Sequence, residues 1–182
     1  TLKLAGEVGD SLPALKGVIA VCPNINPAQC VEALQQPENW IYYKYFLKNL
    51  KDRLQRKAQI FPDKWDLSQL KNIRTLREFD DAFTSKDDGY RDAVDYYERS
   101  GARHVLENIH LPTLIITAQD DPFIPYHIFE ESAIRTNPAI HFVAPRYGGH
   151  CGFLQRPHPD EDLFWAENRI IDFVQHPESV IA

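Results

Sequence analysis

The sequence is poor in the features that mark several classes of protein. It has three cysteines, Cys22, Cys30 and Cys151, an odd number without C-x-x-C spacing, so it predicts neither a disulfide framework nor a zinc clip. No apolar run approaches the roughly 18 residues of a membrane span. Residues 1–20 also lack the charged head and apolar stretch of a signal peptide. Free thiols fit a reducing compartment, and we therefore expect a cytoplasmic protein by default.

The chain also lacks an excess of positive charge. The chain has 20 Lys and Arg against 26 Asp and Glu, a formal net charge of −6, which argues against nucleic acid as a partner. Its 43% hydrophobic and 25% charged residues are ordinary values for a globular domain that buries one core. No internal repeat and no Pro-rich or Gly/Ser-rich tract interrupts the sequence. These values predict a single domain or a large part of one.

Methionine is absent from all 182 residues, and the first residues have an unusual pattern for a chain start. Leu2, Leu4 and Ala5 have helical spacing, like the later turns of a helix. We therefore expect the sequence to be the C-terminal portion of a longer protein.

Three short, β-branched runs predict a parallel sheet that is covered on both faces. They span residues 17–22, 112–118 and 139–144. Residues 126–136 have helical spacing and complete a strand-helix-strand unit. An amphipathic helix is expected from the Pro159–Asp162 region to about residue 175, with apolar side chains at Leu163, Ala166, Ile170, Phe173 and Val174. A sheet of three strands would leave 17–22 at an unpaired edge, so we also expect an upstream strand.

The interval 24–111 is too long for a simple crossover and has helical patterns, so it predicts an inserted helical cap on a core of 1–23 and 112–182. Its first helix, about 39–61, is expected to bury a stripe formed by Tyr43, Phe46, Leu50, Leu54, Ala58 and Phe61. Thr75 and Glu78 form a capping-box pattern that starts a shorter helix.

The helix at 39–61 is also basic, with Lys44, Lys48, Lys51, Arg53, Arg56 and Lys57 against Asp52. A basic amphipathic helix can lie on an anionic membrane surface. The favoured interpretation is a solvated cap helix whose apolar face lies on the core.

Polar loops follow the second and third runs. Asp121 lies just beyond a predicted parallel strand, where open α/β sheets place ligands and catalytic groups, and a carboxylate there can hold an imidazole in one tautomer. The competing role is turn initiation before Pro122, and Asp120 is the alternative acid. His150 follows the third run among Gly148, Gly149 and Gly152, a setting that favours a general base. We assign no role to the other six histidines.

Cys151 directly follows His150, so a Cys-His nucleophile pair has to be considered. Side chains of adjacent residues rarely meet in one in-line contact. We therefore favour a small packing residue at this position.

These segments resemble the α/β-hydrolases of the YheT-like, ABHD1/2/3-type branch. The residues that carry the resemblance are Leu76 to Asp81, Tyr96-Tyr97 with Ser100, Pro112 to Phe123, and Gly148-Gly149-His150-Cys151-Gly152-Phe153. In that family the nucleophilic Ser lies in a G-x-S-x-G elbow and precedes the acid and the base in the chain. The present sequence has no G-x-S-x-G, and residues 1–7 look like the sequence that follows the elbow.

The resemblance implies the C-terminal part of an α/β-hydrolase fold with three parallel strands. It also implies a serine carboxylic ester hydrolase with Asp121 as the acid and His150 as the base, acting on a small-molecule or lipid ester. No metal or organic cofactor is expected. The nucleophile and the oxyanion donors would lie in the missing N-terminal part of the fold, so the chain alone would be inactive. The alternative is a non-catalytic, α/β-hydrolase-like binding or interaction protein.

Overall fold

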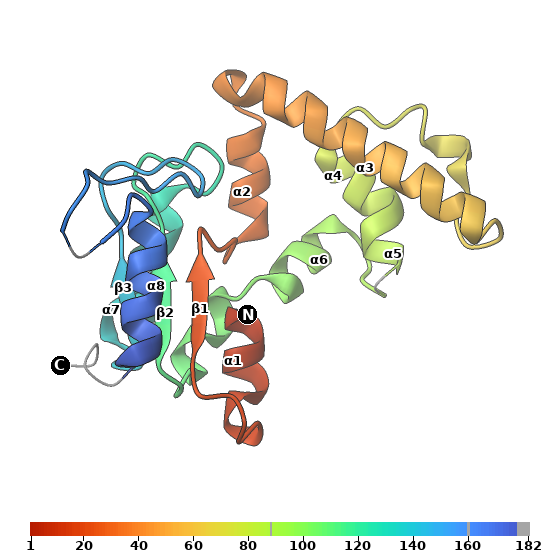
Figure 1. Cartoon of the computed structure of the whole chain (residues 1–182). Helices are drawn as coiled ribbons and strands as arrows, with labels where there is room; N and C mark the ends of the chain where they lie inside the picture. Colours follow the sequence, from red (N-terminus) through yellow and green to blue (C-terminus); the bar gives the residue numbers. More distant parts are fainter. Residues whose placement is uncertain (88, 160, 178–182) are drawn as a thin grey trace. The chain divides into compact units, whose positions relative to one another are not determined.

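The computed structural model divides the chain into two compact units (Figure 1). The first contains residues 1–26 and those from 101 onward, and the second is Pro27–Ser100. The structure describes residues 1–87, 89–159 and 161–177.

The first unit is built on a parallel sheet of three strands in the order β1-β2-β3. The strands are β1 (Val18–Val21), β2 (Thr113–Ile116) and β3 (Ile140–Val143). Every residue of the central strand β2 is buried, as expected for an apolar strand with covered faces. The three predicted parallel strands are therefore confirmed.

Short helices pack around this sheet. The helical elements of the unit are α1 (Leu2–Val8), η1 (Gly9–Ser11), η5 (Arg103–Asn108), η6 (Tyr126–Glu130), α7 (Ser132–Thr136) and α8 (Trp165–Gln175). α1 packs on η5 at Gly6, where an added Cβ would lie 2.2 Å from the backbone oxygen of Val105. α7 packs on β3 and α8 on β2. No helix in the described part of the chain is both long and apolar enough to cross a membrane.

Two predicted helices differ from the observed ones. Residues 126–136 form two pieces instead of one helix, because the backbone of Glu131 is extended (φ −55°, ψ 132°) between η6 and α7. The last helix begins at Trp165, not near Pro159. The amide of Phe164 donates to Asp162 Oδ1, and Leu154 and Phe164 form an antiparallel bridge, so the residues before α8 are non-helical. Asp160 lies outside the described residues.

The terminal helix also buries less than its pattern predicted. Phe173 is buried in α8, as expected, whereas Val174 and Leu163 are exposed. Leu163 lies before the first residue of the helix, so it cannot belong to the helical face.

The regular elements of the second unit are all helical among its described residues. Its elements are α2 (Pro27–Leu34), η2 (Pro37–Asn39), α3 (Trp40–Ile60), η3 (Leu67–Gln69), α4 (Leu76–Phe79), the π-helical turn η4 (Asp80–Thr84), α5 (Ser85–Asp87) and α6 (Ala93–Ser100). The core of this unit joins α3 to the segment that contains α4 and η4.

The buried stripe of α3 differs from the predicted one. Tyr43, Leu47, Leu54 and Ala58 are buried, and Leu50 packs against the same cluster. These positions are separated by steps of three and four, so they share one helical face. Phe46 lies beside that face and is 51% exposed, and Phe61 follows the last residue of α3 and is 56% exposed. The prediction that these two phenylalanines belong to the stripe was wrong.

The predicted capping box at Thr75 is present. The amide of Glu78 donates to Thr75 Oγ1 (3.1 Å), and the amide of Thr75 donates to Glu78 Oε2 (3.2 Å). The amide of Leu76 also donates to Tyr43 Oη (3.0 Å). The cap therefore satisfies the first turn of α4 and ties it to α3.

A partly buried carboxylate, that of Asp80, links the π-helical turn to α6. Tyr97 Oη donates to Asp80 Oδ2 and Thr84 Oγ1 donates to Asp80 Oδ1, both at 2.7 Å. Burial raises the pKa of Asp80, because the charged form loses hydration. The two hydroxyl donors partly offset that cost.

Replacing Tyr97 with Phe should therefore destabilise the second unit. The variant leaves Asp80 with one hydroxyl donor, and we expect the free energy of unfolding in urea to fall by about 1–3 kcal/mol at neutral pH. The loss should shrink as the pH falls through the raised pKa of Asp80, because the protonated carboxyl no longer has to bury a charge.

The matched control is Tyr45→Phe, which removes a hydroxyl from a side chain that is 67% exposed. Its effect should stay within about 0.5 kcal/mol. Equal stability of the Tyr97→Phe and Tyr45→Phe variants would show that the Tyr97 hydroxyl does not support Asp80.

Candidate active site

The predicted acid and base lie at one edge of the sheet because parallel strands in register end together. β2 ends at Ile116 and is followed by the loop with Asp120 and Asp121. β3 ends at Val143, the register partner of Ile116, and is followed by the loop with His150. The amide of Gln119 donates to the oxygen of Pro145 (3.0 Å), which holds the two loops together just beyond the strands.

Asp121 is the acid that reaches His150. Its Oδ2 lies 2.9 Å from His150 Nδ1, and its Oδ1 accepts hydrogen bonds from the amides of Phe123 (2.8 Å) and Ile124 (3.0 Å). The side chain of Asp121 is fully buried, whereas that of His150 is 39% exposed. A carboxylate on Nδ1 favours the Nδ1–H tautomer, which leaves the lone pair of the imidazole on Nε2.

Asp120 has a different place in the structure. Its Oδ1 accepts hydrogen bonds from the amides of Gly148 (2.9 Å) and Gly149 (2.8 Å), the two residues that precede His150. The carboxylate therefore ties the loop after β2 to the loop that carries the imidazole. The geometry brings Asp121, and not Asp120, to His150.

The glycines before His150 have steric reasons to be glycines. An added Cβ at Gly148 would lie 2.5 Å from two ring atoms of Phe153. Gly149 has a φ of +52°, a backbone conformation that favours glycine. The amide of Gly152 donates back to the oxygen of Gly148 (2.9 Å) and closes the bend around His150.

The imidazole is also positioned by an aromatic ring. The Phe123 ring meets the His150 ring edge to face, with 5.2 Å between their centroids. Phe123 belongs to the same turn whose amides bind Asp121. One short turn thus fixes both the carboxylate and the orientation of its partner.

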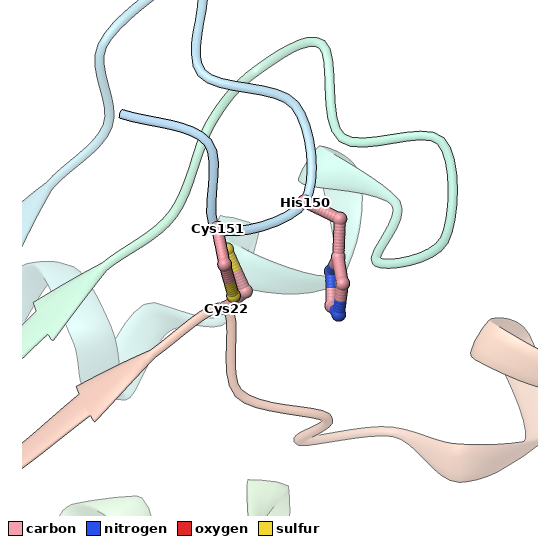
Figure 2. A group of neighbouring side chains, drawn as sticks. All are labelled: Cys22, His150 and Cys151. Carbon is pink, nitrogen blue, oxygen red and sulfur yellow. The ribbon is translucent and has the colours of Figure 1, made fainter. Parts of the chain in front are cut away.

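Two cysteines lie beside His150, and sequence reasoning did not bring them together. Figure 2 shows the Cys22 side chain from the end of β1 next to the Cys151 side chain, with the His150 ring to one side. The two Sγ atoms and a ring nitrogen of His150 all lie within 4.8 Å of one another. Cys151 is exposed, so its interpretation as a small packing residue was wrong. The available signal was that Cys22 directly follows the first strand, as Asp121 and His150 follow the other two.

Both cysteines have left-handed backbone conformations. Cys22 has φ 45° and Cys151 has φ 66°, and they are the non-glycine residues with positive φ in the described ranges. Non-glycine residues in this conformation often mark functional sites. The amide of Cys22 donates to the oxygen of Ile116 (2.7 Å), so the backbone of Cys22 is fixed to β2.

Burial gives Cys22 an unreactive thiol. It raises the pKa of Cys22 to about 12, and the neighbouring Cys151 also influences this pKa. At neutral pH the Cys22 side chain is therefore a neutral thiol and a poor nucleophile.

The sheet and the polar residues at its carboxyl edge define an α/β protein with a candidate hydrolase site. Sequence comparisons support an α/β-hydrolase of the YheT-like, ABHD1/2/3-type branch. This confirms the resemblance seen in the sequence.

The chain is similar to "Putative esterase YheT" of Escherichia coli, with 35% identity over 175 residues that cover 94% of this chain and 50% of that protein. It is 32% identical to "Phospholipase ABHD3" of Mus musculus over 85% of this chain and 38% of that protein. It is 27% identical to "Medium-chain fatty acid ethyl ester synthase/esterase 2" of Saccharomyces cerevisiae over 92% of this chain and 41% of that protein. The chain thus spans half or less of the length of these relatives. No family model matches it, and no solved structure matches it significantly.

The different exposure of the three cysteines makes a prediction for alkylation. Iodoacetamide at mildly alkaline pH should modify Cys151 first, because Cys22 and Cys30 are buried and burial raises the pKa of Cys22. Peptide mass spectrometry of the reduced protein over time measures the three rates. Modification of Cys22 or Cys30 as fast as Cys151 would contradict the burial described here.

Proposed function

We propose that this chain supplies the acid and the base of a serine carboxylic ester hydrolase, with Asp121 as the acid and His150 as the base. The observation that carries the proposal is the 2.9 Å hydrogen bond between His150 Nδ1 and the fully buried Asp121 carboxylate. The names of the relatives support the reaction class, since they describe esterases and a phospholipase.

The nucleophile in this proposal is a serine hydroxyl from outside the 182 residues. The present sequence has no G-x-S-x-G, and the relatives that it matches are at least about twice as long. The oxyanion donors would come from the same additional sequence. On this proposal the chain alone does not hydrolyse esters.

The proton follows a defined route in this mechanism. The serine oxygen attacks the ester carbonyl while His150 Nε2 accepts the hydroxyl proton. His150 then gives that proton to the departing alkoxide, which leaves as the alcohol. Water repeats the sequence on the acyl-enzyme and releases the carboxylic acid. Asp121 holds the ring in the Nδ1–H tautomer and stabilises the imidazolium through both steps.

The second unit has a role in substrate choice in this proposal. Its residues are inserted between β1 and β2 in the chain, and it carries the exposed aromatic side chains Trp40, Tyr42, Tyr45, Phe46 and Phe61. We propose that this unit is the cap that selects the acyl group of the ester.

The base can be tested by labelling and turnover. In the full-length protein, wild type should react with a serine-directed fluorophosphonate, and His150→Ala should lose ester turnover by a factor on the order of 10⁴ or more. The control is His110→Ala, which removes an exposed imidazole that pairs with Asp10. Absence of labelling in wild type would instead favour the non-catalytic binding protein, and full turnover by His150→Ala would exclude the role of this residue.

The two neighbouring acids can be separated by conservative substitutions. Asp121→Asn should lower kcat by about 10⁴ with little change in KM, because an amide donor at Nδ1 favours the wrong tautomer. Asp120→Ala should cost about 10²-fold by releasing the loop that carries His150. Asp120→Asn should restore most of that loss, because its amide oxygen can still accept from Gly148 and Gly149.

Steady-state kinetics on the same ester measures all three variants. A loss in Asp120→Asn as large as in Asp121→Asn would assign the acid role to Asp120.

A further inference from the structure

The group formed by Cys22, His150 and Cys151 has the donor atoms of a soft metal site. Two sulfurs and one imidazole nitrogen form the set that zinc takes in Cys₂His sites with an open fourth position. In such a site, Zn–S distances of about 2.3 Å and Zn–N distances of about 2.0 Å put the ligand atoms roughly 3.5–3.8 Å apart. The two Sγ atoms and one ring nitrogen of His150 lie within 4.8 Å of one another, so closing these side chains around an ion requires movements of about 1 Å.

The second layer of contacts also suits a metal. Metal-binding histidines commonly donate their other ring N–H to a carboxylate, and His150 Nδ1 lies 2.9 Å from Asp121 Oδ2. This arrangement leaves the Nε2 lone pair for the cation. The hydrogen bond between His150 and Asp121, which orients the imidazole as a general base, therefore also orients it as a metal ligand.

The three side chains are held on a fixed backbone, and two of them, His150 and Cys151, are accessible, whereas Cys22 is buried. Cys22 is anchored to β2 through its amide, and the bend with His150 and Cys151 is fixed by Asp120 and by the Gly152–Gly148 hydrogen bond. Cys151 is exposed and His150 is partly exposed, so a hydrated ion has an open approach. Two thiolates would neutralise the charge of one divalent cation.

We propose that Cys22, Cys151 and His150 form a binding site for a thiophilic divalent cation, with Zn²⁺ as the ion of choice. The cation binds the two Sγ atoms and the imidazole, and each thiol loses its proton to solvent. The consequence for catalysis rests on the proposed function: a bound cation occupies the nitrogen that accepts the serine proton, so zinc inhibits ester hydrolysis reversibly.

Cobalt binding tests the site independently of ester hydrolysis. We expect Co²⁺, added to the full-length protein reduced with a phosphine, to give thiolate-to-cobalt charge-transfer absorption and the intense visible bands of a tetrahedral ion, and Zn²⁺ to abolish both. Cys22→Ala and Cys151→Ala should each weaken Zn²⁺ binding, measured by competition with a chromophoric chelator, by about tenfold or more. Asp121→Asn should weaken it by about 10–100-fold.

The matched control is Cys30→Ala, which removes the third cysteine, a buried residue of α2 in the other unit. It should keep both the cobalt spectrum and the zinc affinity. Absence of thiolate bands in the reduced wild-type protein would overturn the site. Equal zinc affinity of the Cys151→Ala and Cys30→Ala proteins would do the same.

Ester turnover with and without Zn²⁺ then tests the consequence. The rate with Zn²⁺ divided by the rate without it should be well below one in wild type and in Cys30→Ala. The same ratio should return toward one in Cys151→Ala. Cobalt binding without any ester turnover would keep the metal site and refute the proposed hydrolase. Turnover that zinc does not change, together with a normal cobalt spectrum, would show that the bound metal leaves Nε2 free and would refute the inhibition.

Discussion

The candidate active site depends on the burial of one carboxylate. Asp121 is fully covered, and a carboxylate in that position is stable only when hydrogen-bond donors replace the water it has lost. The amides of Phe123 and Ile124 and the ring of His150 supply these donors. Because two of them are backbone groups of the following turn, the direction of the carboxylate is set by the chain path after β2. The carboxylate in turn positions the imidazole of His150 through their hydrogen bond.

The loop that carries His150 follows a different strand, β3, and has to lie beside Asp121. The register of β2 with β3 brings both strand ends to one level, and Asp120 then binds the amides of Gly148 and Gly149 across the gap between the loops. The two adjacent acids therefore have different roles: Asp120 binds the backbone of the loop, and Asp121 binds the imidazole of His150. A third strand end delivers Cys22, and the result is a compact group of titratable side chains at one sheet edge.

Much of this arrangement could be predicted from the sequence, because it follows from local patterns. Buried parallel strands are continuous β-branched runs, and polar residues directly behind them share one edge of the sheet. The capping box at Thr75 was likewise visible from its spacing. Other features depend on tertiary contacts. The choice of Leu47 over Phe46 in the buried face of α3 depends on which face of that helix packs on the segment that contains α4 and η4. The start of α8 at Trp165 depends on a bridge between Leu154 and Phe164. The proximity of Cys22 to Cys151 depends on the left-handed backbone conformations of these two residues, which their residue types do not predict.

The imidazole of His150 thus has one nitrogen fixed by Asp121 and one nitrogen available, whether to a proton or to a metal ion. The most direct test of this account is ¹⁵N NMR of histidine-labelled full-length protein at a pH where the ring is neutral, with His150 assigned by comparison with the His150→Gln protein. The account predicts that Nδ1 carries the hydrogen and that Nε2 has the shift of an unprotonated nitrogen. A neutral ring protonated on Nε2 would contradict it, because that tautomer places lone pairs against lone pairs at Asp121 and leaves no base for the hydroxyl.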